Sequence, residues 1–245
     1  MDRTRTRQAL LMVMARPDLE ADEFARKFAV HAGATHASPD GVDYRWARLL
    51  GADEVPRVPH QVFMRESPPP FDAVIQVAAA RPADLATAAT GALGRLAEII
   101  APAETAALVC DEVRITQGDG PIFVVMVLAR RKELSREEFM ARWFGRHAAI
   151  GEAVEGVRYR QLHVVDGDTG SLGAALALGT PRIDGVATSY FETIAEAVQI
   201  LASEAVAVGA LADEKTFIDH TASRFGLYTT YNARPWPSAR TSPGS

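Results

Sequence analysis

The sequence contains a single cysteine, Cys110, and this scarcity excludes a disulfide scaffold and a cysteine-rich metal site. Cys110 ends the apolar run AALVC, so we expect a small buried side chain there rather than a nucleophile. No apolar run approaches the roughly 18 residues of a membrane-spanning helix. We therefore expect a soluble, cytoplasmic protein with no membrane partner.

Positive charge is not in excess, since 26 Lys and Arg stand against 31 Asp and Glu, and nucleic acid is therefore not an expected partner. The six histidines include no H-x-x-x-H or H-E-x-x-H pair, which argues against a metal site. A G-x-G-x-x-G turn and a P-loop are also missing, which argues against a nucleotide cofactor. The expected chemistry therefore uses no metal and no cofactor.

Three pairs of similar segments recur in the same order along the chain. They are MVMARPDLEADEF and MVLARRKELSREEF, GVDYRWARLL and GVRYRQLHVV, and FDAVIQVAA and IDGVATSYF. Their offsets of 114, 115 and 112 residues are nearly constant and predict the duplication of a whole domain. We place the first unit at residues 1–117, the second at 118–233 and an irregular tail at 234–245.

Each unit has the pattern of a ferredoxin-like β-α-β-β-α-β fold, so the predicted class is α+β. The first strand of each unit, ALLMVMA or IFVVMVLA, is apolar on both faces and needs a cover on its second face. We expect the two sheets to pack face to face as an intramolecular pseudo-dimeric α+β barrel with a cavity between them. The alternatives are two independent domains, or partner chains that cover both sheets. The Pro-rich segment 51–70 and the Gly-rich segment 166–182 are expected to be long loops at equivalent places.

Four segments of the second unit resemble the EthD domain of the dimeric α+β-barrel superfamily. They are EEFMARWFGRHAAI, GVRYRQLHVV, DGVATSYF and ADEKTFID. In that family a helix with Phe, Trp and His precedes a strand with Tyr and His, an Asp-Gly pair opens the third strand, and an acidic segment precedes the last. The resemblance implies chemistry on apolar, often aromatic or polyketide-like small molecules, and haem is used elsewhere in the superfamily.

The reactive side chains are expected in the second unit. Alternation along its second strand puts Tyr159, Gln161 and His163 on one face, which we expect to look into the cavity. On the preceding helix, Phe139, Trp143 and His147 are spaced by four and so lie along one side, and Ser135 with Glu138 resembles a capping box at the start. His147 could add a second imidazole. Histidine titrates near neutral pH, so His147 and His163 are the acid–base candidates, and Tyr159 could polarise a carbonyl group.

The remaining candidates are expected to bind the substrate, with the first unit supplying one wall of the site. They are Tyr44, Trp46, Trp143, Gln161, Asp184 and Tyr190. Asp184 could instead bond only to local backbone. The participation of His31 and His36 is left open, and His60 and His220 are expected to be structural.

These residues predict a cofactor-independent lyase or hydro-lyase of the dehydratase, decarboxylase or cyclase type. Its partner would be one apolar organic molecule, and a homodimer through outer surfaces is possible. The first alternative is a cofactor-free oxygenase of anthrone-like aromatics, in which the same imidazole deprotonates the substrate. The second is a non-catalytic carrier or a haem-binding protein with a histidine as axial ligand.

Overall fold

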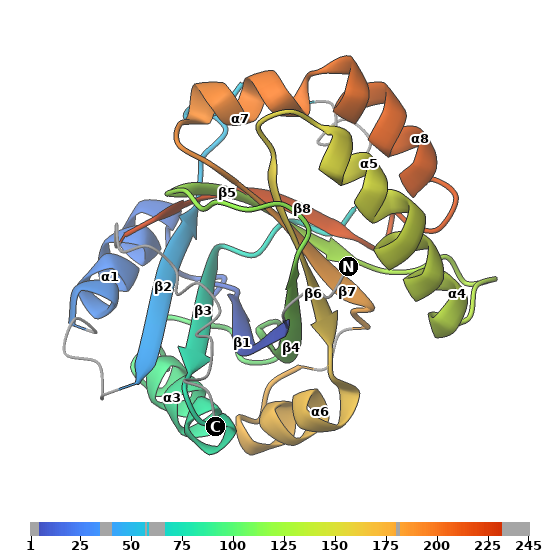
Figure 1. Cartoon of the computed structure of the whole chain (residues 1–245). Coiled ribbons are helices and arrows are strands. Elements are labelled where there is room, and N and C mark those ends of the chain that lie inside the picture. The colour runs from blue at the N-terminus through green and yellow to red at the C-terminus, as the bar shows by residue number, and fades with distance from the viewer. Residues whose placement is uncertain (1–4, 35–40, 57, 59–66, 180–181, 232–245) are drawn as a thin grey trace.

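The computed structural model describes residues 5–34, 41–56, 58, 67–179 and 182–231 (Figure 1). The first half contains β1 (Arg5–Val13), α1 (Ala21–Ala34), β2 (Val42–Leu49), β3 (Ala73–Ala79), α3 (Pro82–Gly94) and β4 (Ala106–Arg114). The second half contains β5 (Ile122–Leu128), α4 (Arg136–Met140), η1 (Ala141–His147), α5 (Ala148–Ala153), β6 (Arg158–Val164), α6 (Asp166–Ala175), β7 (Gly185–Phe191), α7 (Ile194–Leu201), η2 (Ala205–Ala210), α8 (Leu211–Glu214) and β8 (Arg224–Thr230).

The eight strands form one closed antiparallel barrel in the order β1-β3-β2-β8-β5-β7-β6-β4. The first-half strands occupy the order β4-β1-β3-β2, and the second-half strands the order β8-β5-β7-β6. The two sets join where β2 pairs with β8 and where β4 pairs with β6. Each strand thus pairs with two neighbours, and the predicted α+β class is confirmed.

Side chains fill the interior of the barrel. One buried cluster draws members from all eight strands: Leu10, Ala47, Val74, Leu108, Phe123, Leu162, Val186 and Tyr228. Each strand gives one face to this cluster and the other to the helices outside, which is why β1 and β5 are apolar on both faces. The expected chamber between the two sheets is therefore occupied by packed side chains.

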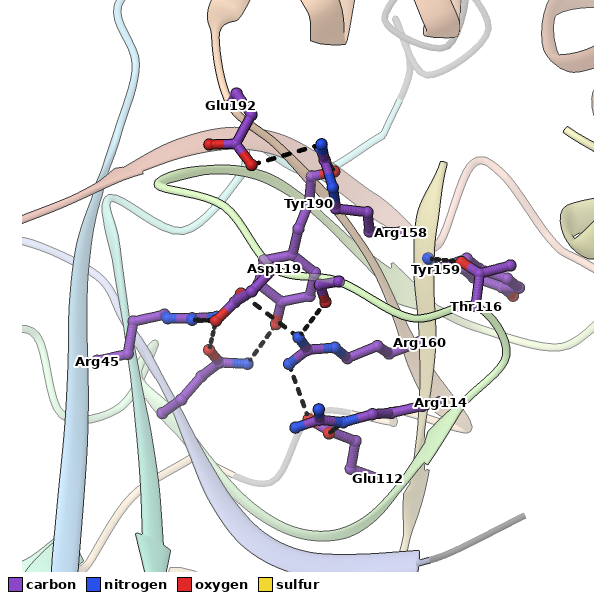
Figure 2. A network of polar contacts seen from close by, with 12 residues as sticks. Arg45, Glu112, Arg114, Thr116, Asp119, Arg158, Tyr159, Arg160, Tyr190 and Glu192 are labelled. Carbon is purple, nitrogen blue, oxygen red and sulfur yellow. Dashed lines mark hydrogen bonds and ion pairs between the residues drawn. The ribbon is translucent and has the colours of Figure 1, made fainter. Parts of the chain in front are cut away.

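A charged network completes this interior where the chain crosses from the first half to the second (Figure 2). Asp119 of the crossing segment forms an ion pair with Arg45 of β2 and lies 3.4 Å from Arg160 of β6. Arg160 is fully buried and also lies 3.4 Å from the buried Glu112. Burying such charges is costly unless they are paired, and here they are paired across both halves.

The two long connections each cover the other half of the molecule. The Gly-rich segment was expected to be a loop, but its residues 166–175 form helix α6 (Figure 1), which packs against β4 of the first half. Leu172 of α6 is buried in the first-half core, and the Thr169 hydroxyl accepts a 2.9 Å hydrogen bond from the Val109 amide. Val55 and Val58 of the Pro-rich segment are buried in the second-half core, while much of that segment lies outside the described residues.

No single helix in the described part of the chain is long and apolar enough to cross a membrane. Within the described ranges, one pair of helices, α7 with the η2–α8 segment, meets the requirement together by length and composition, and this pair is bent by 56°.

Candidate functional site

The helix before β6 carries the predicted Phe, Trp and His along one buried side. It starts with a capping box in which Ser135 and Glu138 bond to each other's backbone amides, as the sequence predicted. It continues from α4 through the π-helical turns of η1 into α5. Phe139, Trp143 and His147 are all buried, so the four-residue spacing correctly identified the inner side. A π-helical stretch within an α-helix is common at functional sites.

Tyr159, Gln161 and His163 form a polar ladder along β6, and this ladder faces the helix rather than the barrel interior. The Trp143 indole nitrogen donates a 3.0 Å hydrogen bond to the Tyr159 hydroxyl, and the ring of Trp143 lies 5.3 Å from that of His163. The prediction that Tyr159, Gln161 and His163 share one face is therefore right. The direction expected for that face is wrong, because Leu162, between them in sequence, takes the interior position.

The hydrogen bonds of the ladder fix the direction of each proton. The Gln161 amide nitrogen donates to the Trp143 carbonyl at 2.8 Å and to the Tyr159 hydroxyl at 3.0 Å. The Gln161 oxygen therefore faces His163, whose Nε2 must carry the hydrogen of their 3.0 Å bond. Because the Tyr159 oxygen accepts from both Gln161 and Trp143, its own hydrogen remains to be donated elsewhere.

A small pocket of about 80 Å³ lies between this sheet and helices α5, α7 and η2. Its wall is mostly apolar, including Val124, Met126, Val206 and Phe225. The polar side chains in its wall, among the described residues, are His147, Tyr159, Ser189 and Glu214. One water needs roughly 10–15 Å³ by this measure, so the pocket accepts a compact organic group.

His147 is oriented by a carboxylate from α8. Its Nδ1 lies 3.1 Å from the Asp213 oxygen Oδ2, and Arg146 contacts the other oxygen of Asp213 at 2.9 Å. A carboxylate can only accept, so neutral His147 carries its hydrogen on Nδ1 and keeps a lone pair on Nε2. Glu214, the next residue, has Oε1 3.8 Å from that Nε2. Both carboxylates are about 5% exposed or less.

Burial separates the roles of the three predicted reactive groups. Desolvation, followed by repulsion from Arg5, lowers the pKa of His163 to about 4, so its imidazole is neutral at pH 7. Burial also raises the pKa of the Tyr159 phenol above its ordinary value, which keeps its hydrogen in place. Tyr159 is therefore suited to donate a hydrogen bond, and the free Nε2 of His147 is suited to accept a proton.

Sequence reasoning missed Asp213 and Glu214 as site residues. They lie 66 and 67 positions after His147, and only the folded chain brings α8 against η1. The available signal was the acidic segment ADEKTFID of the family resemblance, in which these two residues are the Asp-Glu pair.

The structure does not bring the first-half candidates to this pocket. Tyr44 donates to the Ala88 carbonyl of α3 at 3.3 Å, and Trp46 packs edge-on against Phe28 of α1 at 5.2 Å. Both lie in the first half's own core, between its strands and its helices. The expectation that this half supplies a wall of the same site is not met.

Asp184 and Tyr190 also lie outside the pocket. Asp184 accepts a 2.9 Å hydrogen bond from the Arg130 amide and forms an ion pair with its guanidinium group, which is the local backbone role. Tyr190 points into the barrel, where Gln76 donates to its hydroxyl at 2.9 Å and Arg160 stacks on its ring at 4.1 Å (Figure 2).

The other histidines are spread over the molecule. His31 is partly buried at the end of α1, His220 contacts Glu214 at 3.1 Å, and His36 and His60 lie outside the described residues. Across the part of the chain that the structure describes, no three His, Cys, Asp or Glu side chains are grouped to hold a metal ion.

The pocket lies within a segment that a family model identifies. Residues 131–221 match the model of the EthD domain. This segment is similar to an EthD domain. The resemblance predicted from the sequence motifs is thus confirmed, and His147, Tyr159 and His163 all lie within the matched EthD residues. No curated protein sequence matches the chain.

Solved structures extend the similarity of fold beyond the EthD domain to both halves. A variant of the chlorite dismutase from Candidatus Nitrospira defluvii aligns with a TM-score of 0.52 and 13% identity, over 93% of this chain and 94% of that one. A protein from Lactobacillus acidophilus NCFM, named as a candidate monooxygenase, aligns with a TM-score of 0.50 and 7% identity, over 94% and 95%. At these identities the similarity shows the fold alone.

Haem, the cofactor that the EthD resemblance brings into question, does not fit the pocket of the matched segment. A porphyrin is much larger than about 80 Å³. No Lys or Arg among the described residues lines the pocket to pair with its carboxylates, and Glu214 stands 3.8 Å from the nitrogen of His147 that would bind iron.

Proposed function

We propose that the EthD domain catalyses proton transfer on an apolar aromatic or polyketide-like molecule, as a cofactor-independent lyase or hydro-lyase of the dehydratase, decarboxylase or cyclase type. One observation carries the proposal: His147, with its Nδ1 beside Asp213, and Tyr159 line the same apolar pocket. A base and a hydrogen-bond donor side by side are what enolisation requires.

In the proposed reaction, Nε2 of His147 takes a proton from the carbon next to a carbonyl group of the substrate. The electrons of the broken C–H bond form a C=C bond, and the carbonyl oxygen gains negative charge that the Tyr159 hydrogen bond stabilises. Asp213 stabilises the imidazolium through Nδ1. In a dehydratase, the hydroxyl group on the next carbon would then leave as water, taking the proton that His147 holds. In a decarboxylase, loss of CO₂ would form the enolate in place of C–H cleavage, and protonated His147 would supply the proton to the carbon.

The neighbouring ladder residues act as positioning groups in this proposal. Gln161 and Trp143 supply the two hydrogen bonds that hold the Tyr159 oxygen, and neutral His163 holds the Gln161 amide in the required orientation. A hydroxyl that already accepts two hydrogen bonds is preorganised to donate its own, so the donor costs no reorganisation during the reaction.

We also propose that the two halves are diverged copies of a ferredoxin-like unit. Their strand orders correspond, and the offset of about 115 residues pairs Tyr44 with Tyr159 and Trp46 with Gln161. The Trp46 indole, fully buried against Phe28, occupies the place of the Gln161 amide, which would explain why reactive side chains gather in the second copy.

Hydrogen–deuterium exchange tests the proposed function without knowledge of the natural substrate. Acetophenone, a compact neutral ketone, is incubated in D₂O, and deuteration of its methyl group is followed by NMR. We expect the protein to accelerate deuteration, His147→Gln to lower the catalysed rate about 100-fold and Tyr159→Phe about tenfold. His31→Gln, outside the pocket, is the matched control. Equal rates for the wild type and His147→Gln would contradict the role of His147.

A cofactor-free oxygenase is the second candidate, favoured by the same base and by the name of the Lactobacillus neighbour. There, O₂ would react with the carbanion left after proton abstraction. Consumption of O₂ during turnover of an anthrone-like aromatic would favour this reaction over the lyase. A Soret band in the purified protein would instead favour a haem-binding role, and a bound ligand recovered unchanged would favour a carrier.

We also propose that two copies of the chain can associate as a homodimer through their outer helices. Val30 of α1 and Val208 of η2 are 67% and 62% exposed, which leaves apolar groups on the outside of both halves. Light scattering of the protein in solution measures the mass directly, and a monomer at all concentrations would exclude this assembly.

A further inference from the structure

Glu214 and His220 are a titratable pair that the proposed mechanism does not use. Glu214 is 4% exposed, and its two oxygens face two different imidazoles. Oε1 lies 3.8 Å from Nε2 of His147, and Oε2 lies 3.1 Å from Nε2 of His220. His147 lines the pocket, whereas His220 lies between α8 and β8 with its side chain 12% exposed.

The two neighbouring carboxylates of α8 are not equivalent. Asp213 contacts Nδ1 of His147 and is held at its other oxygen by Arg146, so it orients the ring. Glu214 instead faces Nε2, the nitrogen that takes the proton in the proposed reaction. A carboxyl group can accept a proton on one oxygen and release it from the other, so Glu214 is placed to pass on what Nε2 receives.

We propose that Glu214 relays a proton between His147 and His220, so that the pocket exchanges protons with solvent while a ligand covers its mouth. This rests on the proposed function of the same pocket. Protonated His220 gives the hydrogen of its Nε2 to Oε2 of Glu214, which leaves a neutral ring with its hydrogen on Nδ1 and a neutral carboxyl group. The carboxyl group turns about its Cγ–Cδ bond and gives the proton to Nε2 of neutral His147. The same steps in reverse carry a proton from Nε2 of His147 to Nε2 of His220, and so to solvent.

The relay makes the titration of the two imidazoles interdependent. Among the residues that the structure describes, the titratable groups in contact with His147 are Asp213, Glu214 and Tyr159, and Glu214 also contacts His220. A proton on one ring partly neutralises the negative charge of Glu214, which then attracts a proton to the other ring less strongly. The first proton therefore binds to the pair more readily than the second, and each ring shows two steps rather than one.

NMR of protein labelled with ¹⁵N-histidine measures these titrations in the full chain without a ligand. We expect two-step curves for His147 and His220 in the wild type. Glu214→Gln should give single-step curves for both rings, because the carboxylate that couples them is lost. His220→Gln should make the His147 curve single-step, and the exposed Glu137→Gln should change neither curve.

The relay is overturned if His147 titrates in a single step in the wild type, or identically in the wild type, Glu214→Gln and His220→Gln. Cooperative thermal unfolding of each variant confirms that it is folded. Because the titrations need no turnover, this outcome would leave the proposed base role of His147 standing. Conversely, coupled titration without acetophenone deuteration would support the relay and contradict the reaction.

Discussion

Mild acid should destabilise the protein through His163. Burial lowers the pKa of this imidazole from 6.5 to about 4, so between these values the unfolded chain binds a proton that the folded chain does not. The contribution of His163 to the free energy of unfolding is therefore fully present above this pH window and is lost as the pH decreases through it. For a shift of this size, linkage gives a loss of about 2 kcal/mol between pH 7 and pH 5.

His163→Gln isolates this contribution. The new side-chain amide can donate to Gln161 from the place of Nε2, but it does not titrate. Urea denaturation at pH 7 and pH 5, followed by fluorescence, should show that the variant loses about 2 kcal/mol less than the wild type. His31→Gln controls for the removal of a histidine elsewhere. Equal losses in the wild type and His163→Gln would refute the assignment of His163 as a neutral positioning group and restore it as a candidate acid.

Three further substitutions test the packing around the site and in the barrel, each by urea denaturation at pH 7. Gly185→Ala places a Cβ 2.3 Å from a ring carbon of Trp143 and should lower the free energy of unfolding by about 1–3 kcal/mol. Gly209→Ala is the control: a Cβ there meets nothing within 4 Å, so the change should be neutral or stabilising. Equal stabilities of the two variants would contradict the close packing at Gly185. Arg160→Ala removes the buried guanidinium between Glu112 and Asp119, although Glu112 keeps its 2.8 Å ion pair with Arg114, and should cost roughly 2–3 kcal/mol. A neutral result would mean that water reaches this network. Trp143→Phe removes the indole group that donates to the Tyr159 hydroxyl and should lower the free energy of unfolding by about 1 kcal/mol. An unchanged stability would contradict this contribution.

Local patterns in the sequence predicted the elements of the site well. The Ser135–Glu138 capping box, the four-residue spacing that buries Trp143 and His147, and the alternation along β6 depend on near neighbours in sequence. Such periodicities follow from helix and strand geometry alone. The EthD motifs therefore identified the right segments before any coordinates.

Long-range packing decided what the sequence left open. Alternation showed that Tyr159 shares a face with His163, but not whether that face meets the barrel interior or the helices, since both surroundings are apolar. The glycines of 166–175 hid helix α6, which Leu172 fixes against the other half of the molecule. Asp213 reaches His147 across 66 positions, a contact that no local pattern encodes.

A crystal structure of the protein with acetophenone tests the central claim most directly. The account predicts that the ketone lies between the β6 ladder and helices α5, α7 and η2, with its oxygen within hydrogen-bonding distance of the Tyr159 hydroxyl and its methyl carbon beside Nε2 of His147. A ketone bound inside the barrel, or bound elsewhere while this pocket stays empty, would contradict it.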